Sequence, residues 1–328
     1  MTNPIRFLVF VLLLALSPIT RADWYQRTDA IMGTRIFVEL WSDDADQAHQ
    51  LIQQVMDEMH RVDKLMSPYI ETAQLAIVNR DAATRPVAIT PELFNLIVTA
   101  NHYSDLSGGA FDITYASLGH EFDYRKHIHP DAEQIKEALP LINYKAVKLD
   151  SAKHTIFFPH KGMQIDLGGI AKGYAVDKCI AILQKAGIKH AIVTAGGDSR
   201  LLGDHRGRPW MMGIKNPRGD ASVVSIPLEN VAISTSGDYE RYFIENGVRY
   251  DHIIDPKKGK SPTEVVSATI IADNATETDA LSTTIFILGV KKGLALANSL
   301  TGVSAILIDH TGKIFYSNDL APPDSKGS

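Results

Sequence analysis

Residues 163–195 read MQIDLGGIAKGYAVDKCIAILQKAGIKHAIVTA, and this stretch decides the fold class. Met163 to Leu167 is a short apolar run typical of a strand, and Gly168-Gly169 is typical of a tight turn. From Ile170 to Lys185 the apolar residues recur at helical spacing. His190 to Ala195 is a second apolar run. The segment therefore predicts a β-α-β unit whose helix begins at a glycine turn.

The rest of the chain mixes strand and helix signals. Helix starts are expected after Ser42, where acidic residues follow, and at Thr90, where Pro91 takes the first helical position. Because these elements do not alternate regularly, we predict an α+β fold: a compact body with mixed β-sheets and packed helices, plus a smaller N-terminal lobe. Short β-like runs occur at residues 36–40, 223–226, 231–234, 265–272 and 303–309.

Composition is that of an ordinary globular protein. The 328 residues are 45% hydrophobic and 22% charged, with a net charge of −5. There is no basic stripe and no zinc-finger or RNA-binding motif, so nucleic acid is not an expected partner.

The N-terminus resembles a targeting segment. Arg6 precedes the apolar run Phe7 to Leu16, and Thr20-Arg21-Ala22 is a plausible cleavage site. We expect residues 1–22 to be a signal peptide and the mature protein to be exported, most simply to the periplasm. An uncleaved membrane anchor is the alternative, although the run is shorter than the roughly 20 apolar residues that span a bilayer.

The single cysteine bears on both redox chemistry and anchoring. Cys179 lies inside the helical pattern and is expected to be a small buried hydrophobe. No cysteine follows the apolar run, so a lipid-modified N-terminus is not expected. We predict one catalytic domain at residues 23–320, built of two lobes, and a disordered tail at residues 321–328.

The run ATETDALST at residues 275–283 places two oxygen ligands on one helix face. Asp279 and Thr283 are four residues apart and therefore neighbours on a helix. Carboxylate and hydroxyl oxygens suit Mg²⁺, which takes few protein ligands and keeps water or phosphate in its shell. The alternative is a capping box, with Thr276 as the N-cap and Asp279 at the third helical position.

Two glycine turns carry acids. Asp166 precedes Gly168-Gly169 and the helix start, where free N–H groups favour an anion such as phosphate. The spacing fits neither a P-loop nor a dinucleotide fingerprint, so an ordinary turn remains an alternative. Gly196-Gly197-Asp198 closes the next predicted strand in the same way. If the two strands are neighbours, both turns border one crevice.

Three further segments have both a functional and a structural interpretation. Ser234 to Arg241 is rich in hydroxyls and suits phosphate or ribose contact, or is a turn. His252 could accept a proton near neutral pH, or be a structural hydrogen-bonding residue. Tyr69 could stack on a planar ring, or pack at a lobe boundary.

Taken in order, these segments resemble the FAD:protein FMN transferase family (ApbE-like flavin transferases). The resemblance runs from Met32 to about Gly302 and implies an ApbE/T-fold-like α+β catalytic body. The motifs that carry it are MGT at Met32, SPY at Ser67, GGAFD at Gly108, DLGGIAKGYAVD at Asp166, GGD at Gly196, STSGDYERYF at Ser234, HIIDP at His252 and ETDALSTT at Glu277.

The resemblance implies a reaction and its partners. FAD is cleaved at its pyrophosphate, FMN passes to a threonine or serine hydroxyl of another protein, and AMP leaves. Mg²⁺ is required. The acceptors are exported or membrane-bound flavoprotein subunits that carry a Gly-Ala-Thr-like motif. Many family members are lipoproteins and this chain departs from that pattern, so peripheral association with the inner membrane is an open possibility.

The resemblance also implies roles for single residues. Asp279 and Thr283 match the side-chain metal ligands, and the carbonyl of Gly169 matches a third contact. His252 and Asp279 are the expected catalytic residues, and His252 is the candidate proton acceptor, with Asp255 or Asp238 as substitutes. The residues expected to hold FAD are Met32, Tyr69, Ala110, Phe111, Asp112, Asp166, Lys172, His252 and Ile253.

Two other functions fit the same residues. A hydrolase could use the metal site and water to split FAD into FMN and AMP. A non-catalytic carrier could bind FAD without reacting. The nucleophile alone separates the first alternative from the transferase, and the sequence does not specify it.

Overall fold

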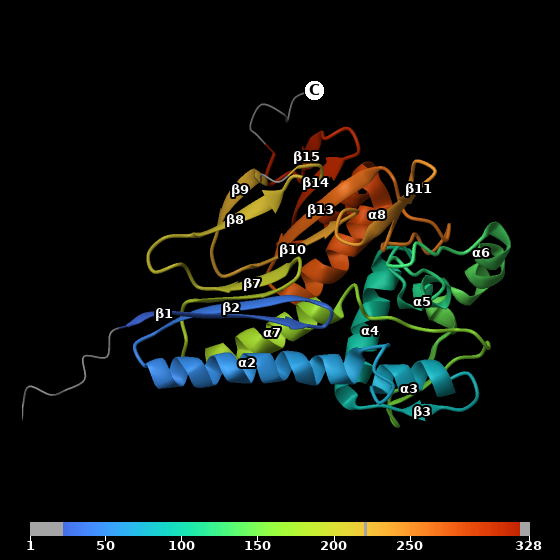
Figure 1. Cartoon of the computed structure of the whole chain (residues 1–328), viewed down its shortest axis with the longest axis horizontal. Coiled ribbons are helices and arrows are strands. Elements are labelled where there is room, and N and C mark those ends of the chain that lie inside the picture. The colour runs from blue at the N-terminus through green and yellow to red at the C-terminus, as the bar shows by residue number, and fades with distance from the viewer. Residues whose placement is uncertain (1–21, 220–221, 322–328) are drawn as a thin grey trace, which may run out of the picture.

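A computed structural model describes residues 22–219 and 222–321 of the chain. Its centre is an eight-stranded sheet in the order β1-β2-β6-β7-β10-β13-β14-β15 (Figure 1). Every neighbouring pair in this sheet is antiparallel. The bounds of its strands are β1 Asp23–Ile31, β2 Thr34–Ser42, β6 Ala191–Ala195, β7 Asp198–Leu202, β10 Ala232–Gly237, β13 Val265–Ala272, β14 Ser304–Asp309 and β15 Ile314–Tyr316.

Three long helices pack against one face of this sheet (Figure 1). They are α2 (Ala45–Met66), α7 (Ala171–Lys185) and α8 (Ala275–Ser299). Strand residues alternate between faces, so Ala191 and Val193 join the helix-side core while Ile192 faces the other side. That other side is covered by the ribbon of β8 (Trp210–Lys215) and β9 (Ser222–Leu228). The result is a layered α+β body with a closed core, as predicted.

The smaller lobe is formed by the chain between α2 and α7. The segment before α2 belongs to the main body, because β1 and β2 pair into the main sheet next to β6. It lies on the right of Figure 1 and is mainly helical. Its elements are α3 (Gln74–Asp81), β3 (Val87–Ala88), α4 (Pro91–Leu106), η1 (Ile113–Tyr115), α5 (Ala116–Gly119), α6 (Ala132–Ala138), η2 (Leu139–Leu141), η3 (Tyr144–Ala146), β4 (Lys148–Asp150) and β5 (Thr155–Phe157).

A hairpin of β11 (Tyr242–Glu245) and β12 (Val248–Asp251) links the main body to this lobe. Phe243 and Tyr250 on the hairpin stack with each other, and His129 of the lobe stacks on Tyr250 with ring centroids 4.3 Å apart. His129 also hydrogen-bonds Glu245 at 2.8 Å. The lobe is thereby attached to the segment that leads into His252.

Several predicted boundaries are confirmed. Thr90 caps α4 and Pro91 is its first residue. The runs at 265–272 and 303–309 are β13 and β14, and the helix expected after Ser42 is α2. α8 has the length and composition of a membrane span, but half of its most apolar window is buried against the sheet, as in the core helix of a globular domain.

The predicted strand at Met163 to Leu167 is wrong, and with it the β-α-β unit. These residues are extended but join no sheet. Their polar groups are satisfied elsewhere, since the side-chain amide of Asn79 bonds both the N–H and the carbonyl of Ile165, and the N–H of Asp166 donates to Ile113. Side chains and a loop thus take the place of a neighbouring strand.

The predicted signal peptide at 1–22 and tail at 321–328 lie outside the described residues, apart from Ala22 and Ala321.

Candidate active site

The N-terminal turns of α7 and α8 cross in close contact, and Gly173 makes this possible. A Cβ atom built on Gly173 would lie 2.0 Å from the carbonyl oxygen of Ala275 and 2.8 Å from the Cβ of Asp279. Only glycine leaves room for the two backbones to approach this closely. The contact brings the side chains of the first turn of α7 next to Asp279.

Each of these helices supplies a carboxylate to the N-terminus of the other. Asp177 of α7 accepts the backbone N–H groups of Ala275 and Thr276, both at 2.8 Å. Asp279 of α8 accepts the N–H of Gly173 at 2.9 Å. Both carboxylates therefore lie at the positive end of a helix dipole, which stabilises their charge.

The capping-box interpretation of Asp279 is wrong. The N-cap of α8 is Asn274, whose side-chain oxygen accepts the N–H of Glu277 at 2.9 Å. Thr276 lies inside the helix and its hydroxyl donates to Asp177. Asp279 is consequently free of any capping role in its own helix.

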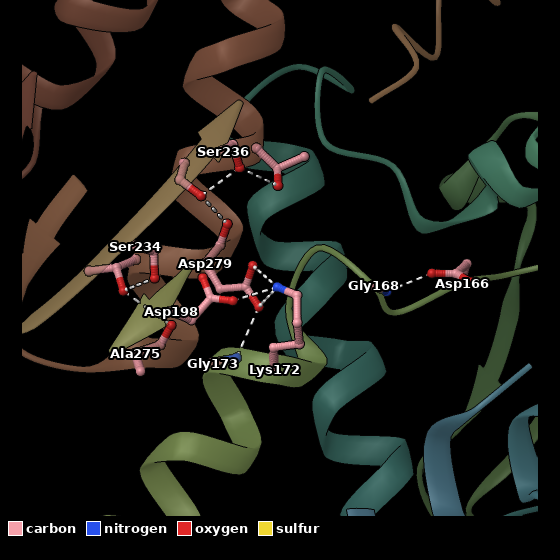
Figure 2. A network of polar contacts seen from close by, with 12 residues as sticks. Asp166, Gly168, Lys172, Gly173, Asp198, Ser234, Ser236, Ala275 and Asp279 are labelled. Atoms are coloured by element: carbon pink, nitrogen blue, oxygen red, sulfur yellow. Dashed lines mark hydrogen bonds and ion pairs between the residues drawn. The ribbon is translucent and has the colours of Figure 1, made fainter. Parts of the chain in front are cut away.

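Lys172 lies between two buried carboxylates (Figure 2). Its Nζ is 2.5 Å from Asp198 Oδ2, and 3.3 and 3.4 Å from the two oxygens of Asp279. The side chains of both acids are 3% exposed and that of Lys172 is 28% exposed. With both acids ionised, this cluster of two carboxylates and one ammonium group carries a net charge of −1.

The pKa values reflect this imbalance. Burial, followed by the charge of Asp198, raises the pKa of Asp279 to about 7. Burial alone would lower the pKa of Lys172, but the carboxylates of Asp198 and Asp279 raise it overall, so this lysine stays charged. A buried carboxylate that is incompletely neutralised favours binding of an additional cation.

The other predicted metal ligands lie close by. Thr283 is one turn after Asp279 on α8, and its Oγ1 is 3.2 Å from Ser236 Oγ on β10. A Cβ atom built on Gly169 would lie 3.4 Å from Thr283 Oγ1, so the glycine turn packs directly against this hydroxyl. The structure therefore brings together Gly169, Asp279 and Thr283 from two distant segments.

This set fits Mg²⁺ and does not fit a softer metal. No group of three or more His, Cys, Asp or Glu side chains suited to a metal occurs within residues 22–219 and 222–321. A single carboxylate, a hydroxyl and a backbone carbonyl are hard oxygen donors, and Mg²⁺ commonly takes only one or two carboxylates from protein.

Tyr69 and Asp166 border the glycine turn. Asp166 accepts the N–H of Gly168 at 2.6 Å, and the Tyr115 hydroxyl lies close enough to influence the ionisation of this carboxyl. Burial raises the pKa of Asp166. Tyr69 is 86% exposed and close enough to Asp166 for the charge of that carboxylate to help raise the Tyr69 pKa. An exposed aromatic ring beside an anion-binding turn suits stacking on a planar ligand.

Met32 is in the turn of the β1–β2 hairpin, with a positive φ of 55°. The guanidinium of Arg241 donates to the carbonyl of the next residue, Gly33, at 2.9 Å. The positive charge of Arg241 also acts on His252 and Asp166. Arg241 therefore links the Met32 turn to the wall that contains His252.

Ala110, Phe111 and Asp112 are all buried. The Phe111 ring lies 3.1 Å from a Cβ atom built on Gly169, so it supports the glycine turn from below. The Asp112 carboxylate accepts the N–H groups of Thr114 and Tyr144 at 2.8 and 3.1 Å. Its side chain thus shapes the loop and is already occupied within the protein.

His252 follows β12, and Ile253 beside it is buried with its N–H donated to Asp251. Burial, then the positive charges of Arg241 and Lys172, lowers the pKa of His252 to about 4. Its buried Nδ1 has no hydrogen-bond partner among the described residues. His252 is therefore a neutral imidazole at neutral pH and can accept a proton.

The two substitutes for His252 are engaged elsewhere. Asp238 forms two hydrogen bonds with Arg218, at 2.7 and 2.6 Å. Asp255 accepts the N–H of Lys257 at 2.9 Å and pairs with the Lys258 ammonium at 3.0 Å. These contacts favour His252 as the proton acceptor.

Sequence reasoning missed four residues of this site. Asp198 and Ser236 were visible in the GGD and STSGD motifs but were assigned no individual role. Arg241 lies within the STSGDYERYF motif and was likewise assigned no individual role. Tyr115 was not singled out because its partner, Asp166, is 51 positions away.

Comparisons with known proteins show the family to which this chain belongs. The sequence profile of the ApbE family matches residues 32–307. The FAD:protein FMN transferase of Treponema pallidum is 33% identical over 310 residues, covering 88% of this chain and 85% of that protein. The crystal structure of the ApbE protein from Thermotoga maritima superposes with a TM-score of 0.84 at 34% identity, covering 90% of this chain and 98% of the other.

The flavin transferase ApbE from Vibrio cholerae has a TM-score of 0.80 at 26% identity, covering 91% of this chain and 98% of that one. The profile match extends over most of the chain, and the structural likeness includes both the main body and the smaller lobe. This chain therefore belongs to the ApbE family and is a transferase.

Proposed function

We propose that this chain transfers FMN from FAD to a threonine or serine hydroxyl of another protein and releases AMP. The family membership supports the reaction type. The observation that carries the proposal is the cluster of Asp279, Thr283 and Gly169. These residues bring hard oxygen donors and a glycine turn to one place.

The chemistry is a phosphoryl transfer. The acceptor hydroxyl oxygen bonds to the flavin-side phosphorus of FAD, and the bond from that phosphorus to the bridging oxygen breaks. The bridging oxygen leaves with AMP, and the hydroxyl proton passes to a base. Such reactions depend mainly on positioning and on charge neutralisation.

Asp279, Thr283 and the carbonyl of Gly169 would hold Mg²⁺. The ion supplies positive charge to the pyrophosphate oxygens. The chain contributes charge of its own: Lys172 and Arg241 place positive groups near the same turn, and the glycine turn offers backbone N–H groups. Tyr69, whose ring is exposed, is the candidate platform for a planar ring.

His252 is the proposed proton acceptor. Its imidazole is neutral and Nδ1 has no partner in the described chain, so a lone pair is available in at least one tautomer. The low pKa makes it a weak base in the free protein. The negative charge of a bound pyrophosphate would raise that pKa and strengthen it as a base.

Incubation of the protein with FAD, Mg²⁺ and a peptide carrying a Gly-Ala-Thr motif tests the proposal. Mass spectrometry should show a peptide that has gained FMN less one water, together with free AMP. A peptide with valine in place of the threonine is the control and should stay unmodified. Free FMN with no labelled peptide would instead establish an FAD pyrophosphatase. FAD binding that survives Asp279→Ala with no product at any metal concentration would indicate a flavin carrier.

We also propose that the protein acts after export, in the periplasm, on exported or membrane-bound acceptors. The support is the charged and apolar N-terminal sequence, Arg6 and Phe7 to Leu16. Cell fractionation with N-terminal sequencing tests this. A soluble periplasmic chain beginning at Asp23 is expected, whereas an intact N-terminus in the membrane fraction would establish an uncleaved anchor.

A further inference from the structure

Asp198 is held rigidly beside the metal-site residues, yet it is not one of the proposed ligands. It begins β7 and lies inside the main sheet, paired with Ala195 of β6 and Ser234 of β10. The turn before it is closely packed, since a Cβ atom built on Gly197 would lie 2.6 Å from the carbonyl of Thr235. Its carboxylate therefore has a fixed position.

Lys172 contacts both Asp198 and Asp279, and it lies closer to Asp198. Lys172 Nζ is 2.5 Å from Asp198 but 3.3 and 3.4 Å from the oxygens of Asp279. Charge-assisted N–H···O bonds are typically about 2.7–2.9 Å long. The short contact is to Asp198, and the contacts to Asp279 are long.

Asp279 is left with one short hydrogen bond, from the N–H of Gly173 at 2.9 Å. Both contacts from the ammonium group are longer than a strong ion pair, and the carboxylate is buried. A carboxylate in this state can accept a divalent cation without first breaking a tight salt bridge.

We propose that Asp198 is a positioning residue that holds Lys172 away from Asp279 and so keeps the Asp279 carboxylate available to a divalent cation. The inference rests on the proposed function only for the metal-binding role of Asp279. Without Asp198, Asp279 would be the one carboxylate partner left to Lys172 within residues 22–219 and 222–321, and the lysine would compete with the metal for it. Asp198 thus sets metal affinity through the lysine and does not contact the metal.

Calorimetric measurement of Mg²⁺ binding, without FAD or acceptor, tests this with four proteins: the unaltered chain, Asp198→Asn, Lys172→Met and the double variant. We expect Asp198→Asn to weaken Mg²⁺ binding by about 10- to 100-fold, within the range of coupling seen in a shared ion-pair network. Adding Lys172→Met to that variant should restore the affinity to within about threefold of the unaltered protein, because no competing ammonium group remains.

The Asp198 charge could instead attract the metal directly, without acting through Lys172, and this alternative predicts different Mg²⁺ affinities for the four proteins. In that case Lys172→Met would raise the affinity by the same factor with or without Asp198. The competition account requires a larger effect of Lys172→Met in the Asp198→Asn background. Equal factors in the two backgrounds, or a double variant as weak as Asp198→Asn, would overturn the proposal.

Two controls distinguish the expected change in Mg²⁺ affinity from a loss of folding and from a failure of the proposed reaction. Asp251→Asn changes another buried carboxylate, outside the Lys172 cluster, and should leave Mg²⁺ affinity unchanged. If Asp198→Asn alone fails to fold, the double variant is compared with Lys172→Met, because removing both members of a buried pair is often tolerated. Similar Mg²⁺ affinities in these two proteins are expected when no lysine remains to compete, and a double variant at least about tenfold weaker would overturn the proposal. An unaltered protein that binds no Mg²⁺ overturns the inference, whereas normal Mg²⁺ binding without FMN transfer overturns only the proposed function.

Discussion

Replacing Gly173 by alanine should separate the two helices that form the site. The new Cβ atom would lie 2.0 Å from the carbonyl oxygen of Ala275, about 1.4 Å short of ordinary contact at 3.4 Å. Overpacking of this kind costs about 1–3 kcal/mol. Weakening the hydrogen bond from the Gly173 N–H to Asp279 costs about 1.5–3 kcal/mol more, while alanine gains about 1 kcal/mol in helix propensity. The expected net loss is therefore about 1.5–5 kcal/mol.

Urea unfolding followed by circular dichroism measures this loss, and calorimetry with Mg²⁺ measures the effect on the site. Gln184→Ala, an exposed substitution near the other end of α7, is the matched control and should change stability by less than about 0.5 kcal/mol. We expect Gly173→Ala to lower both stability and Mg²⁺ affinity. A variant stabilised by about 1 kcal/mol, as helix propensity alone predicts, would refute the close-contact argument.

Four further substitutions test separate parts of the account. Asp279→Asn should abolish Mg²⁺-dependent transfer. It should not lower stability at neutral pH, because the amide replaces a buried charge. Undiminished transfer would exclude Asp279 as a metal ligand. His252→Ala should slow transfer. It should also remove the acidic limb that we expect in the pH profile of kcat/KM near pH 4, which is the pKa of His252 when no substrate is bound. An unchanged profile would reject His252 as the base. Burial raises the pKa of Asp251 to about 7, so this carboxyl keeps a proton in the folded state between about pH 4 and 7. Asp251 should therefore lower stability by at most about 4 kcal/mol as pH rises across that window, and unfolding of Asp251→Asn should lack this contribution; an unchanged pH dependence of stability would contradict the shift. Tyr69→Ala should leave stability within about 0.5 kcal/mol because the ring is exposed, but weaken FAD binding by about 2- to 12-fold, as the loss of one stacking contact implies; unaltered FAD fluorescence titrations would contradict this.

The local parts of the site could be predicted from sequence because they depend on spacing within one element. Asp279 and Thr283 share a face of α8 by helical geometry alone. Gly169, which the family resemblance grouped with Asp279 and Thr283, packs against Thr283. The apolar periodicity of α2 likewise indicates which of its faces is buried, whereas β13 is an apolar run that is buried on both faces.

The tertiary parts could not be predicted in this way. Met163 to Leu167 has a strand-like composition, but the side chain of Asn79 satisfies the backbone of Ile165, and no pattern in the sequence announces a partner 86 positions away. The capping role of Asn274 depends on where α8 begins, and helix boundaries are poorly marked by composition.

The electrostatic environment of the site could not be predicted from the sequence either. The link from Lys172 to Asp198 depends on the sheet order, which places β7 beside β6 and next to the start of α7. The same holds for the depressed pKa of His252, which arises from burial and from Arg241 and Lys172 on other elements. The sequence therefore supplied the reacting groups, and the fold supplied their protonation states.

The most direct test of the proposed reaction follows the flavin-side phosphorus atom itself. FAD carrying radioactive phosphorus only at that phosphate is incubated with Mg²⁺, this protein and a flavoprotein subunit that contains a Gly-Ala-Thr motif. The account predicts label covalently bound to the acceptor threonine and unlabelled AMP in solution. Label found only in free FMN, with the acceptor unmodified, would contradict it.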